Sequence, residues 1–394
     1  MGLDEEGEQG AAQAHPLSDA VVTSLQRILA ASVGEGHVGR VETLWERENV
    51  LRVETTRAHV VVKLARGLPD GQADRGTLQS EAVALTLCNS MPTPVAPRLI
   101  GFDPEVDLVV MEELPPGRTL AEVLLLGDAA SADGALQDLA RALATLHAHT
   151  STRENEYDAA AAGLTAPKVR RAWLVQAREE WAASLGALGS LVATAGVDRE
   201  LEWALDHLET TPYRGLVHGD LCPDNLRFTE DGVRIFDYEA SSFGPIALDA
   251  AYFVAPFPSC WCFAAMPVPA SDRALAAYRE QLARQGLEPT DAFEVDLAAA
   301  LACFLAVRLG QLPGALSADD AWGTTTMRPR LVQWVTSFVR HDAARATFPR
   351  LHGAAATLLE VLQARWPEVR VPRYPAFGPP DEAVAVPDFW QPGL

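Results

Sequence analysis

The pattern of apolar residues changes near Leu114, and this change constrains the fold more than any other feature of the sequence. Before it, the runs VGRVETLW, NVLRVET and HVVVKLAR are short, rich in β-branched residues and separated by polar turns, which is typical of an antiparallel sheet. After it, segments such as ALQDLARALATLHAH have the apolar spacing of long helices. The sequence therefore predicts an α+β protein with a β-rich first lobe and a larger, mainly helical second lobe.

The length of 394 residues also favours two lobes, because a single hydrophobic core stops growing at roughly 250–300 residues. We expect a disordered tail over residues 1–17 and a first lobe, with its sheet and a helix, over residues 18–114. A helical second lobe is expected over residues 115–370. The Pro-rich residues 371–394 are expected to form an extended tail.

Charge narrows the range of partners. The chain has 32 Lys and Arg against 53 Asp and Glu, a formal net charge of −21, which repels nucleic acid and anionic membrane surfaces. A negative field attracts a cationic small molecule, although solubility alone also explains such a surface. No apolar run reaches the ~18 residues of a membrane span, and no signal peptide is recognisable. We expect a cytoplasmic protein; its oligomeric state is unspecified.

The five cysteines, at positions 88, 222, 260, 262 and 303, do not form the pattern of a disulfide framework. A reducing compartment is therefore expected. Cys260 and Cys262, which flank Trp261, have no second pair or nearby His to complete a zinc site. We expect them to be small buried hydrophobic residues.

Polar residues concentrate in LVHGDLCPDNLRF, residues 216–228. Asp220 is followed five residues later by Asn225, the interval of the kinase catalytic loop H-R-D-x-x-x-x-N, and Asp237 ends the strand-like GVRIF. Phosphoryl transfer needs a base, oxygen ligands for Mg²⁺ and a cation on the phosphates. Each residue alone could instead cap a turn, hold a loop or form a surface ion pair. Their combination predicts phosphoryl transfer.

The first lobe contains a candidate for the cation. Lys63 ends an apolar strand, and the chain has only one other lysine, Lys168, so arginine is its usual basic residue. A lysine here indicates a site that needs a compact ammonium, unless the side chain simply extends from an edge strand into solvent. Glu81, on the predicted helix after that strand, is expected to pair with Lys63.

The segments HGDLCPDN and IFDYEA resemble the aminoglycoside phosphotransferase family, the kinase-like group that includes choline, homoserine and macrolide kinases. The resemblance covers roughly residues 40–340. It implies a protein-kinase-like fold with ATP or GTP bound between the lobes. It further implies that Asp220 is the catalytic base and that Asn225 and Asp237 bind Mg²⁺.

The same resemblance implies supporting roles for three residues. His218 is expected to be a scaffold residue, and Asp249 is expected to brace the catalytic loop. Glu239 lies at a position that is often acidic in the family, where it either assists a second metal ion or belongs to the surface.

The segment DLVVMEELPPG resembles the hinge of kinases. The backbone groups of Glu113 and Leu114 would then hydrogen-bond to the purine edge, with Met111 behind the base. A strand that leads into a turn is the alternative.

Several kinase features are missing. There is no G-x-G-x-x-G; LWERENVLRV occupies its place, with Glu48 and Asn49 expected at the turn. Gly219 stands where protein kinases have Arg, and no A-P-E segment follows Asp237. These differences favour a small-molecule kinase that phosphorylates a hydroxyl of a metabolite or antibiotic.

A cationic acceptor such as an aminoglycoside is the leading expectation, by family analogy. Acids of the second lobe that could meet a cation, without being assigned to it, are Asp272, Glu280, Asp319 and Asp320. Two other functions are considered. A nucleotide-binding pseudokinase scaffold is disfavoured by the intact catalytic residues, and a protein kinase by the missing Arg and activation segment.

Overall fold

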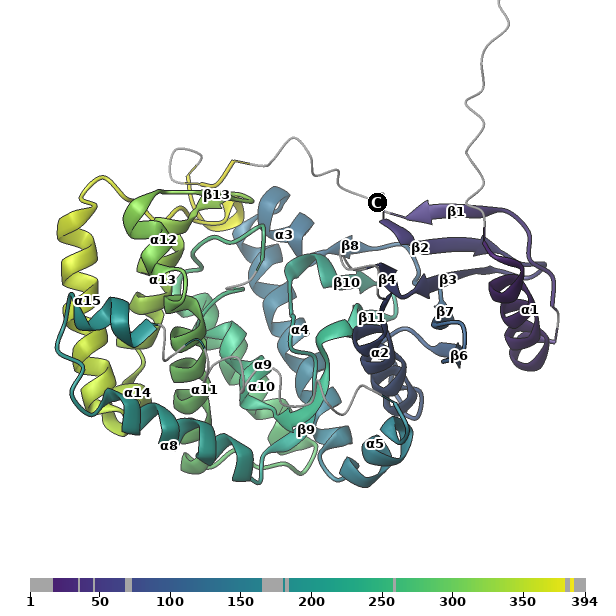
Figure 1. The fold of residues 1–394 in the computed structure, drawn as a ribbon, viewed down its shortest axis with the longest axis horizontal. Coiled ribbons are helices and arrows are strands. Elements are labelled where there is room, and N and C mark those ends of the chain that lie inside the picture. The colour runs from purple at the N-terminus through teal and green to yellow at the C-terminus, as the bar shows by residue number, and fades with distance from the viewer. Residues whose placement is uncertain are drawn as a thin grey trace, which may run out of the picture.

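The computed structural model describes residues 17–34, 36–44, 47–67, 73–164, 180, 184–257, 260–379 and 383–385. Nearly all of the tail expected at 1–17 lies outside these residues, as does part of the tail at 371–394. The run APKVRRAWLVQAREEWAASLGAL, residues 166–188, also predicts a helix, and most of it lies outside the described residues. A strand-rich lobe and a larger helical lobe lie side by side (Figure 1). The predicted fold class, α+β with a protein-kinase-like arrangement of two lobes, is confirmed.

The first lobe is built on a five-stranded sheet in the order β1-β2-β3-β7-β6, in which every neighbouring pair is antiparallel. A short hairpin of β4 and β5 precedes the helix α2. The elements of this lobe are α1 (Asp19–Val33), β1 (Val41–Leu44), β2 (Arg47–Glu54), β3 (His59–Leu64), β4 (Arg66–Gly67), β5 (Ala73–Asp74), α2 (Arg75–Cys88), β6 (Leu99–Asp103) and β7 (Leu108–Glu112).

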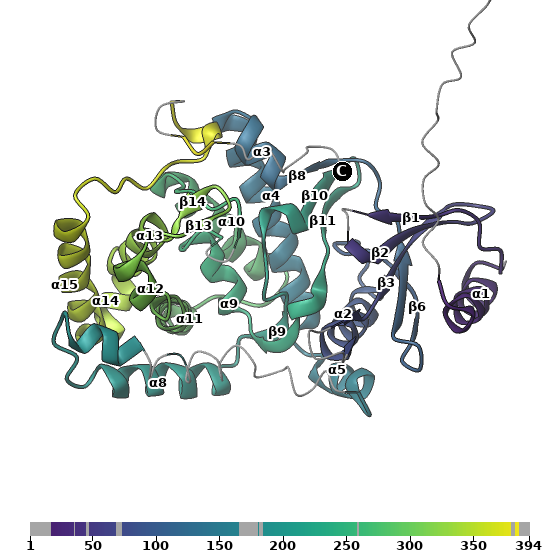
Figure 2. The same ribbon diagram turned by 45° about the horizontal axis from the view of Figure 1, so that its top comes forward.

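Different helices cover the two faces of the sheet. Apolar residues of α1 pack on one face, against Val60 and Val62 of β3, while α2 lies on the opposite face, toward the helical lobe (Figure 2). Successive side chains of a strand point to opposite faces. Lys63 therefore points away from α1 and toward α2, which carries Glu81.

Glu48 and Asn49 do not lie at a turn, contrary to the expectation from the sequence. Both belong to β2, and the Asn49 side chain donates to the carbonyl of Leu64 on β3 at 3.2 Å. β2 begins at Arg47, so the strand extends further back than the polar character of Glu48 and Asn49 suggests.

The second lobe is mainly helical and contains two small sheets near its border with the first. β12 pairs with β9, and β10 pairs with both β11 and β8, all antiparallel. Its described elements up to residue 253 are β8 (Arg118–Thr119), α3 (Leu120–Leu126), α4 (Ala129–Thr150), α5 (Glu154–Ala161), α8 (Val197–Thr210), β9 (Arg214–Val217), η1 (Pro223–Asn225), β10 (Leu226–Thr229), β11 (Gly232–Ile235), η2 (Tyr238–Ala240), β12 (Ser242–Pro245), α9 (Ala247–Ala250) and η3 (Ala251–Phe253).

The remaining elements are α10 (Val268–Arg284), α11 (Asp291–Leu309), α12 (Leu312–Ser317), β13 (Ala321–Trp322), β14 (Thr325–Thr326), α13 (Met327–Val339), α14 (Asp342–Thr347), α15 (Pro349–Arg365) and η4 (Pro375–Phe377). Among the described residues, no helix is both long and apolar enough to cross a membrane.

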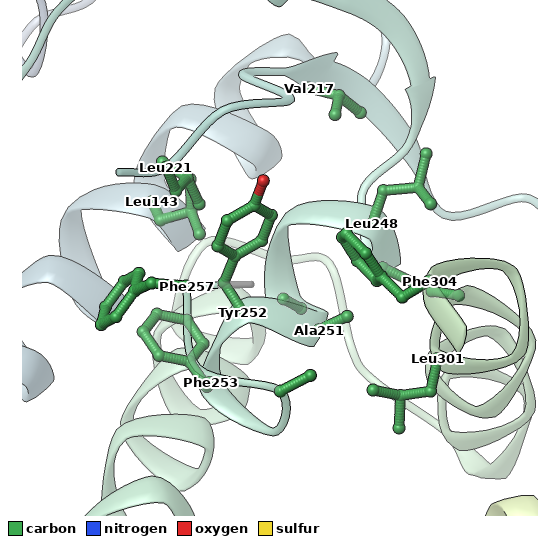
Figure 3. Packing of buried hydrophobic residues seen from close by; sticks show 14 of the residues in the cluster. Leu143, Val217, Leu221, Leu248, Ala251, Tyr252, Phe253, Phe257, Leu301 and Phe304 are labelled. Atoms are coloured by element: carbon green, nitrogen blue, oxygen red, sulfur yellow. The ribbon is translucent and has the colours of Figure 1, made fainter. Parts of the chain in front are cut away.

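A continuous apolar core supports the loop after β9. Tyr252 lies at its centre, with its hydroxyl directed toward the loop between Val217 and Leu221 (Figure 3). That hydroxyl donates to the carbonyl of Gly219 at 3.2 Å, and the Tyr252 ring packs edge-on against Phe304 of α11, with ring centroids 5.4 Å apart. The core thus links α11 to the loop that carries Asp220.

Candidate active site

The loop that carries Asp220 is fixed by a buried carboxylate. Asp249 is fully buried and accepts hydrogen bonds from the backbone N–H groups of His218 (2.7 Å) and Gly219 (2.9 Å). The ring of His147 lies 3.1 Å from the same carboxylate and is itself held by Tyr278. Gly219 has a φ of 80°, and a Cβ there would lie 2.6 Å from the carbonyl oxygen of Ala240. A glycine is therefore required at this turn.

Two contacts tie this loop to the segment that ends in Asp237. His218 is buried, and its Nε2 lies 3.0 Å from the carbonyl of Phe236. The N–H of Phe236 donates to the carbonyl of Asn225 at 3.0 Å. Asn225 in turn donates through Nδ2 to the backbone carbonyl of Asp220 at 3.1 Å. Asp220, Asn225 and Asp237 therefore belong to one hydrogen-bonded unit.

Lys63 lies against this unit from the first lobe. Its Nζ is 2.8 Å from Oε2 of Glu81, 2.6 Å from Oδ1 of Asp237 and 3.5 Å from Oε1 of Glu239. The Lys63 side chain is 8% exposed and that of Glu81 is 1% exposed. One ammonium thus joins β3, α2 and the segment after β11, which are distant in the sequence.

Burial and the neighbouring charges together shift the pKa values of Lys63, Glu81 and Asp237. Desolvation opposes the charge on Lys63, but the carboxylates of Glu81, Asp237 and Glu239 outweigh it and raise the pKa of the ammonium above its ordinary value. Burial raises the pKa of Glu81, against the opposing effect of Lys63. Desolvation works against the charge on Asp237 too, yet Lys63 lowers its pKa. Lys63 and Asp237 are therefore both charged near neutral pH.

Asp237 has a left-handed backbone, with φ of 67° and ψ of 59°. For a residue with a Cβ this conformation costs about 1–2 kcal/mol. The surrounding contacts must hold it in place, and the cost is typical of functional positions. Two arginines add positive charge beside the carboxylates that surround Lys63. Arg47 lies 3.9 Å from Asp237, and Arg66 lies 3.3 Å from Glu239.

The site has oxygen donors suited to a hard divalent cation. Carboxylate oxygens of Glu81, Asp237 and Glu239 all lie within 4.8 Å of one another. Asn225 uses its amide nitrogen for Asp220, which leaves its side-chain oxygen as a further candidate ligand. Carboxylate and amide oxygens are ligands that Mg²⁺ accepts, so the donor set fits this ion.

The residues expected at a hinge follow β7. Met111 is buried on the strand, and Glu113 and Leu114 come directly after it, half-buried. The carboxylate of Glu113 binds Arg52 of β2, with 2.9 Å between Oε1 and Nε. This ion pair fixes the side chain of Glu113 on the sheet and leaves the role of its backbone a prediction.

Comparison with known proteins identifies the family of this chain. The sequence profile of the phosphotransferase enzyme family matches residues 38–293. The chain belongs to this family. The suspected relationship is thereby confirmed, as is the expectation of an enzyme that transfers a phosphoryl group to a hydroxyl of a small molecule. No sequence among curated proteins matches the chain.

The chain is similar to several solved structures. A protein from Ralstonia eutropha JMP134, described as a candidate aminoglycoside phosphotransferase, has 17% identity and a TM-score of 0.50, covering 87% of this chain and 98% of its own. Choline kinase from Streptococcus pneumoniae has 15% identity and a TM-score of 0.43, covering 85% and 98%. A macrolide 2'-phosphotransferase from Brachybacterium faecium has 21% identity and a TM-score of 0.44, covering 84% and 99%.

One expectation about the cysteines of this phosphotransferase is wrong. Cys222, two residues after Asp220, forms a disulfide with Cys260, with Cα atoms 5.4 Å apart; the other three cysteines are free and buried. The fold returns the segment around Cys260 against the catalytic loop, where Trp261 Nε1 also donates to Asp224 at 2.9 Å. Cys262 is buried as expected. Spacing in the sequence gave no sign of the pairing, because 38 residues separate the two cysteines.

Sequence reasoning also missed Arg308 of α11. It is the only charged residue in the run from Leu297 to Leu309, and burial lowers the pKa of its guanidinium, partly offset by Tyr252, Asp220 and Glu180. An arginine that interrupts an otherwise apolar helix face was a usable signal, because such a charge is costly to bury without a partner.

The disulfide leads to a direct chemical prediction. When the protein is purified in air without reductant and then denatured, iodoacetamide should label three cysteines, and five after reduction. Cys260→Ser should raise the label count without reduction to four, because it frees Cys222. Five labels on the unreduced wild-type protein, counted by intact-mass spectrometry, would contradict the pairing.

Proposed function

We propose that this phosphotransferase moves the γ-phosphate of ATP or GTP to a hydroxyl of a small metabolite or antibiotic, with Asp220 as the general base. The observation that carries the proposal is the contact of Lys63 with both Glu81 and Asp237, beside the loop of Asp220 and Asn225. Phosphoryl transfer requires a phosphate-binding cation, metal ligands and a base in one place, and this arrangement supports the proposal that these residues serve those roles.

Nucleotide binding follows from the position of Lys63. We place the nucleotide where the first lobe, residues 18–114, meets the helical lobe, residues 115–370, with its base near Met111 and the backbone of Glu113 and Leu114. Glu81 fixes the Lys63 ammonium, so that this cation is positioned before the phosphates arrive. With a nucleotide bound, Lys63 would hold the phosphates, and Asp237 would be available to hold the metal ion.

Asp237 and Asn225 would hold Mg²⁺, with Glu239 close enough to assist. Bound there, the ion supplies positive charge that screens the phosphate oxygens from an incoming nucleophile. Asp237 is held in position by its segment, which is tied to His218 and Asn225 through Phe236. His218 and Asp249 act as scaffold residues, since both are fully buried and bound to backbone groups.

Asp220 would accept the proton of the acceptor hydroxyl as its oxygen attacks the γ-phosphorus. The carboxylate is half-buried at the end of the loop, with Oδ1 3.4 Å from Sγ of Cys222. Because the donor is a nucleoside triphosphate, we place the reaction in the cytoplasm. Where the acceptor is an antibiotic, its phosphorylation would give resistance to that antibiotic.

A pseudokinase scaffold would keep nucleotide binding without transfer. Asp220→Asn separates the two functions. It should lower kcat by about 10²–10⁴-fold while nucleotide affinity, measured by calorimetry, stays within about twofold, because only proton removal is lost. Asp231→Asn, in the exposed turn between β10 and β11, is the matched control and should behave as wild type. Full turnover in the Asp220→Asn enzyme would exclude this residue as the base.

The metal assignment has its own test. Asp237→Asn should raise the Mg²⁺ concentration needed for half-maximal activity by at least about tenfold, because a carboxylate ligand is replaced by a neutral amide. The measurement is a Mg²⁺ titration at saturating nucleotide after removal of metal by chelation. Glu230→Gln, at the same exposed turn as Asp231, serves as control. An unchanged Mg²⁺ requirement would show that Asp237 does not bind the ion.

A further inference from the structure

Asn225, the candidate metal ligand of the catalytic loop, lies in a very short turn. This turn, η1 (Pro223–Asn225), has three residues of 3-10 helix and no side-chain cap. The N–H of Asn225 closes it by donating to the carbonyl of Cys222 at 2.9 Å. Short 3-10 turns have poor hydrogen-bond geometry and little stability of their own. Contacts with the rest of the fold must therefore fix the orientation of η1.

Asp224, the middle residue of η1, makes one such contact. Its Oδ2 accepts a hydrogen bond from the indole Nε1 of Trp261 at 2.9 Å, although the two residues are 37 positions apart in the sequence. Both side chains are partly shielded from solvent. A carboxyl group that loses part of its hydration needs a hydrogen-bond donor in return. The indole N–H is such a donor, and it joins η1 to a distant segment of the second lobe.

The backbone of Trp261 is itself held by the hairpin of β13 and β14. Its carbonyl accepts hydrogen bonds from the N–H of Thr324 at 2.8 Å and from Oγ1 of the same residue at 3.1 Å. The buried Arg330 donates to this carbonyl at 3.2 Å and to the carbonyl of Cys260 at 2.9 Å. Gly323, with a φ of 60°, allows the hairpin to approach so closely, because a Cβ there would collide with the carbonyl oxygen of Trp261. The indole is therefore presented to Asp224 from a fixed backbone.

The disulfide joins the same two segments a second time. Cys222 directly precedes η1, and its partner Cys260 directly precedes Trp261. The segment of Trp261 thus contacts the loop on both sides of Pro223. The orientation of η1 in turn places the side chain of Asn225, which lies beside the backbone of Asp220 through the bond of its Nδ2.

We propose that Trp261 is a positioning residue for phosphoryl transfer, which acts through Asp224 to orient η1 so that the side-chain oxygen of Asn225 faces the metal ion. This inference rests on the proposed function, in which Asn225 and Asp237 hold Mg²⁺. Trp261 itself touches neither the ion nor a substrate. It places a ligand before the ion arrives, and a ligand that is already ordered binds more tightly than one that must be ordered on binding.

The test removes each side of this hydrogen bond in turn. Trp261→Phe removes the indole N–H and keeps an aromatic ring, and Asp224→Ala removes the acceptor. Asp224→Asn keeps an oxygen that can accept from the indole. The full-length proteins are studied with dithiothreitol, so that the disulfide does not mask the loss, and five cysteines should then react with iodoacetamide. Trp203→Phe and Asp231→Ala, which change exposed residues on α8 and between β10 and β11, are the matched controls.

The first readout is the binding of Mn²⁺, a paramagnetic substitute for Mg²⁺, measured by electron paramagnetic resonance with a non-hydrolysable ATP analogue. Trp261→Phe and Asp224→Ala should each weaken binding by about 3–10-fold, because a ligand is misplaced but not removed. Asp224→Asn should stay within about twofold of wild type, because the hydrogen bond is kept. The variant with both Trp261→Phe and Asp224→Ala should bind no more weakly than either alone, because both changes remove the same bond.

The second readout is hydrogen exchange of residues 216–228 in the metal-free protein, followed by mass spectrometry. The N–H groups of Cys222 and Asn225 are bonded within this loop. They should exchange faster in Trp261→Phe and Asp224→Ala than in wild type or in Asp224→Asn, because the loop opens more often when its tie is lost. This measurement needs neither turnover nor metal.

The outcomes separate this inference from the proposed metal site. Weaker Mn²⁺ binding together with faster exchange supports the inference. Unchanged Mn²⁺ binding in Trp261→Phe and Asp224→Ala, with binding weakened by Asp237→Asn, overturns it and leaves the metal site intact. Unchanged binding in Asp237→Asn as well removes the proposed metal site and the inference with it.

Two further results would overturn the positioning role. Weaker Mn²⁺ binding with unchanged exchange would mean that the loop had not moved. A loss in Asp224→Asn as large as in Asp224→Ala would mean that Asp224 acts through its charge and not through Trp261. Should Trp261→Phe fail to fold, the comparison of the two Asp224 variants decides, because it leaves the indole in place.

Discussion

The ion pair of Lys63 and Glu81 is the contact on which the rest of the site depends. A buried ammonium is costly unless partners compensate it, and Lys63 has Glu81 on one side and Asp237 on the other. These partners come from α2 and from the segment after β11. Satisfying one charge therefore requires the sheet, the helix α2 and the second lobe to come together, and it defines where the lobes meet.

In the second lobe, a buried network of hydrogen bonds holds the segments of Asp220 and Asp237 next to Lys63. Asp249 binds the backbone of the catalytic loop, His218 binds the backbone before Asp237, and Asn225 closes the connection between them. Inside a protein such hydrogen bonds are strong, and leaving any one partner unpaired is costly. The network holds Asp237 in its left-handed conformation and aligns it with Lys63.

Much of this could be predicted from the sequence because the information is local. The β-branched run HVVVKL identifies β3, the geometry of a strand places Lys63 on the face opposite Val62, and the Asp220 to Asn225 interval lies within one loop. The pairing of Cys222 with Cys260 could not be predicted, since it depends on how a segment 38 residues away folds back. Glu48 and Asn49 were misplaced because polar residues on an exposed strand resemble a turn. Arg308 was missed because the position of α11 depends on tertiary packing, in which Phe304 of this helix contacts Tyr252.

The central claim is that Lys63, Asp237, Asn225 and Asp220 serve one nucleotide and one metal ion. The most direct test is a crystal structure with a non-hydrolysable ATP analogue and Mg²⁺. We expect Lys63 still bound to Glu81 but moved from Asp237 to the phosphates, with oxygens of Asp237 and Asn225 on the ion and Asp220 facing the γ-phosphate. A nucleotide bound elsewhere, or a Lys63 that remains on Asp237 beside a bound nucleotide, would contradict the account.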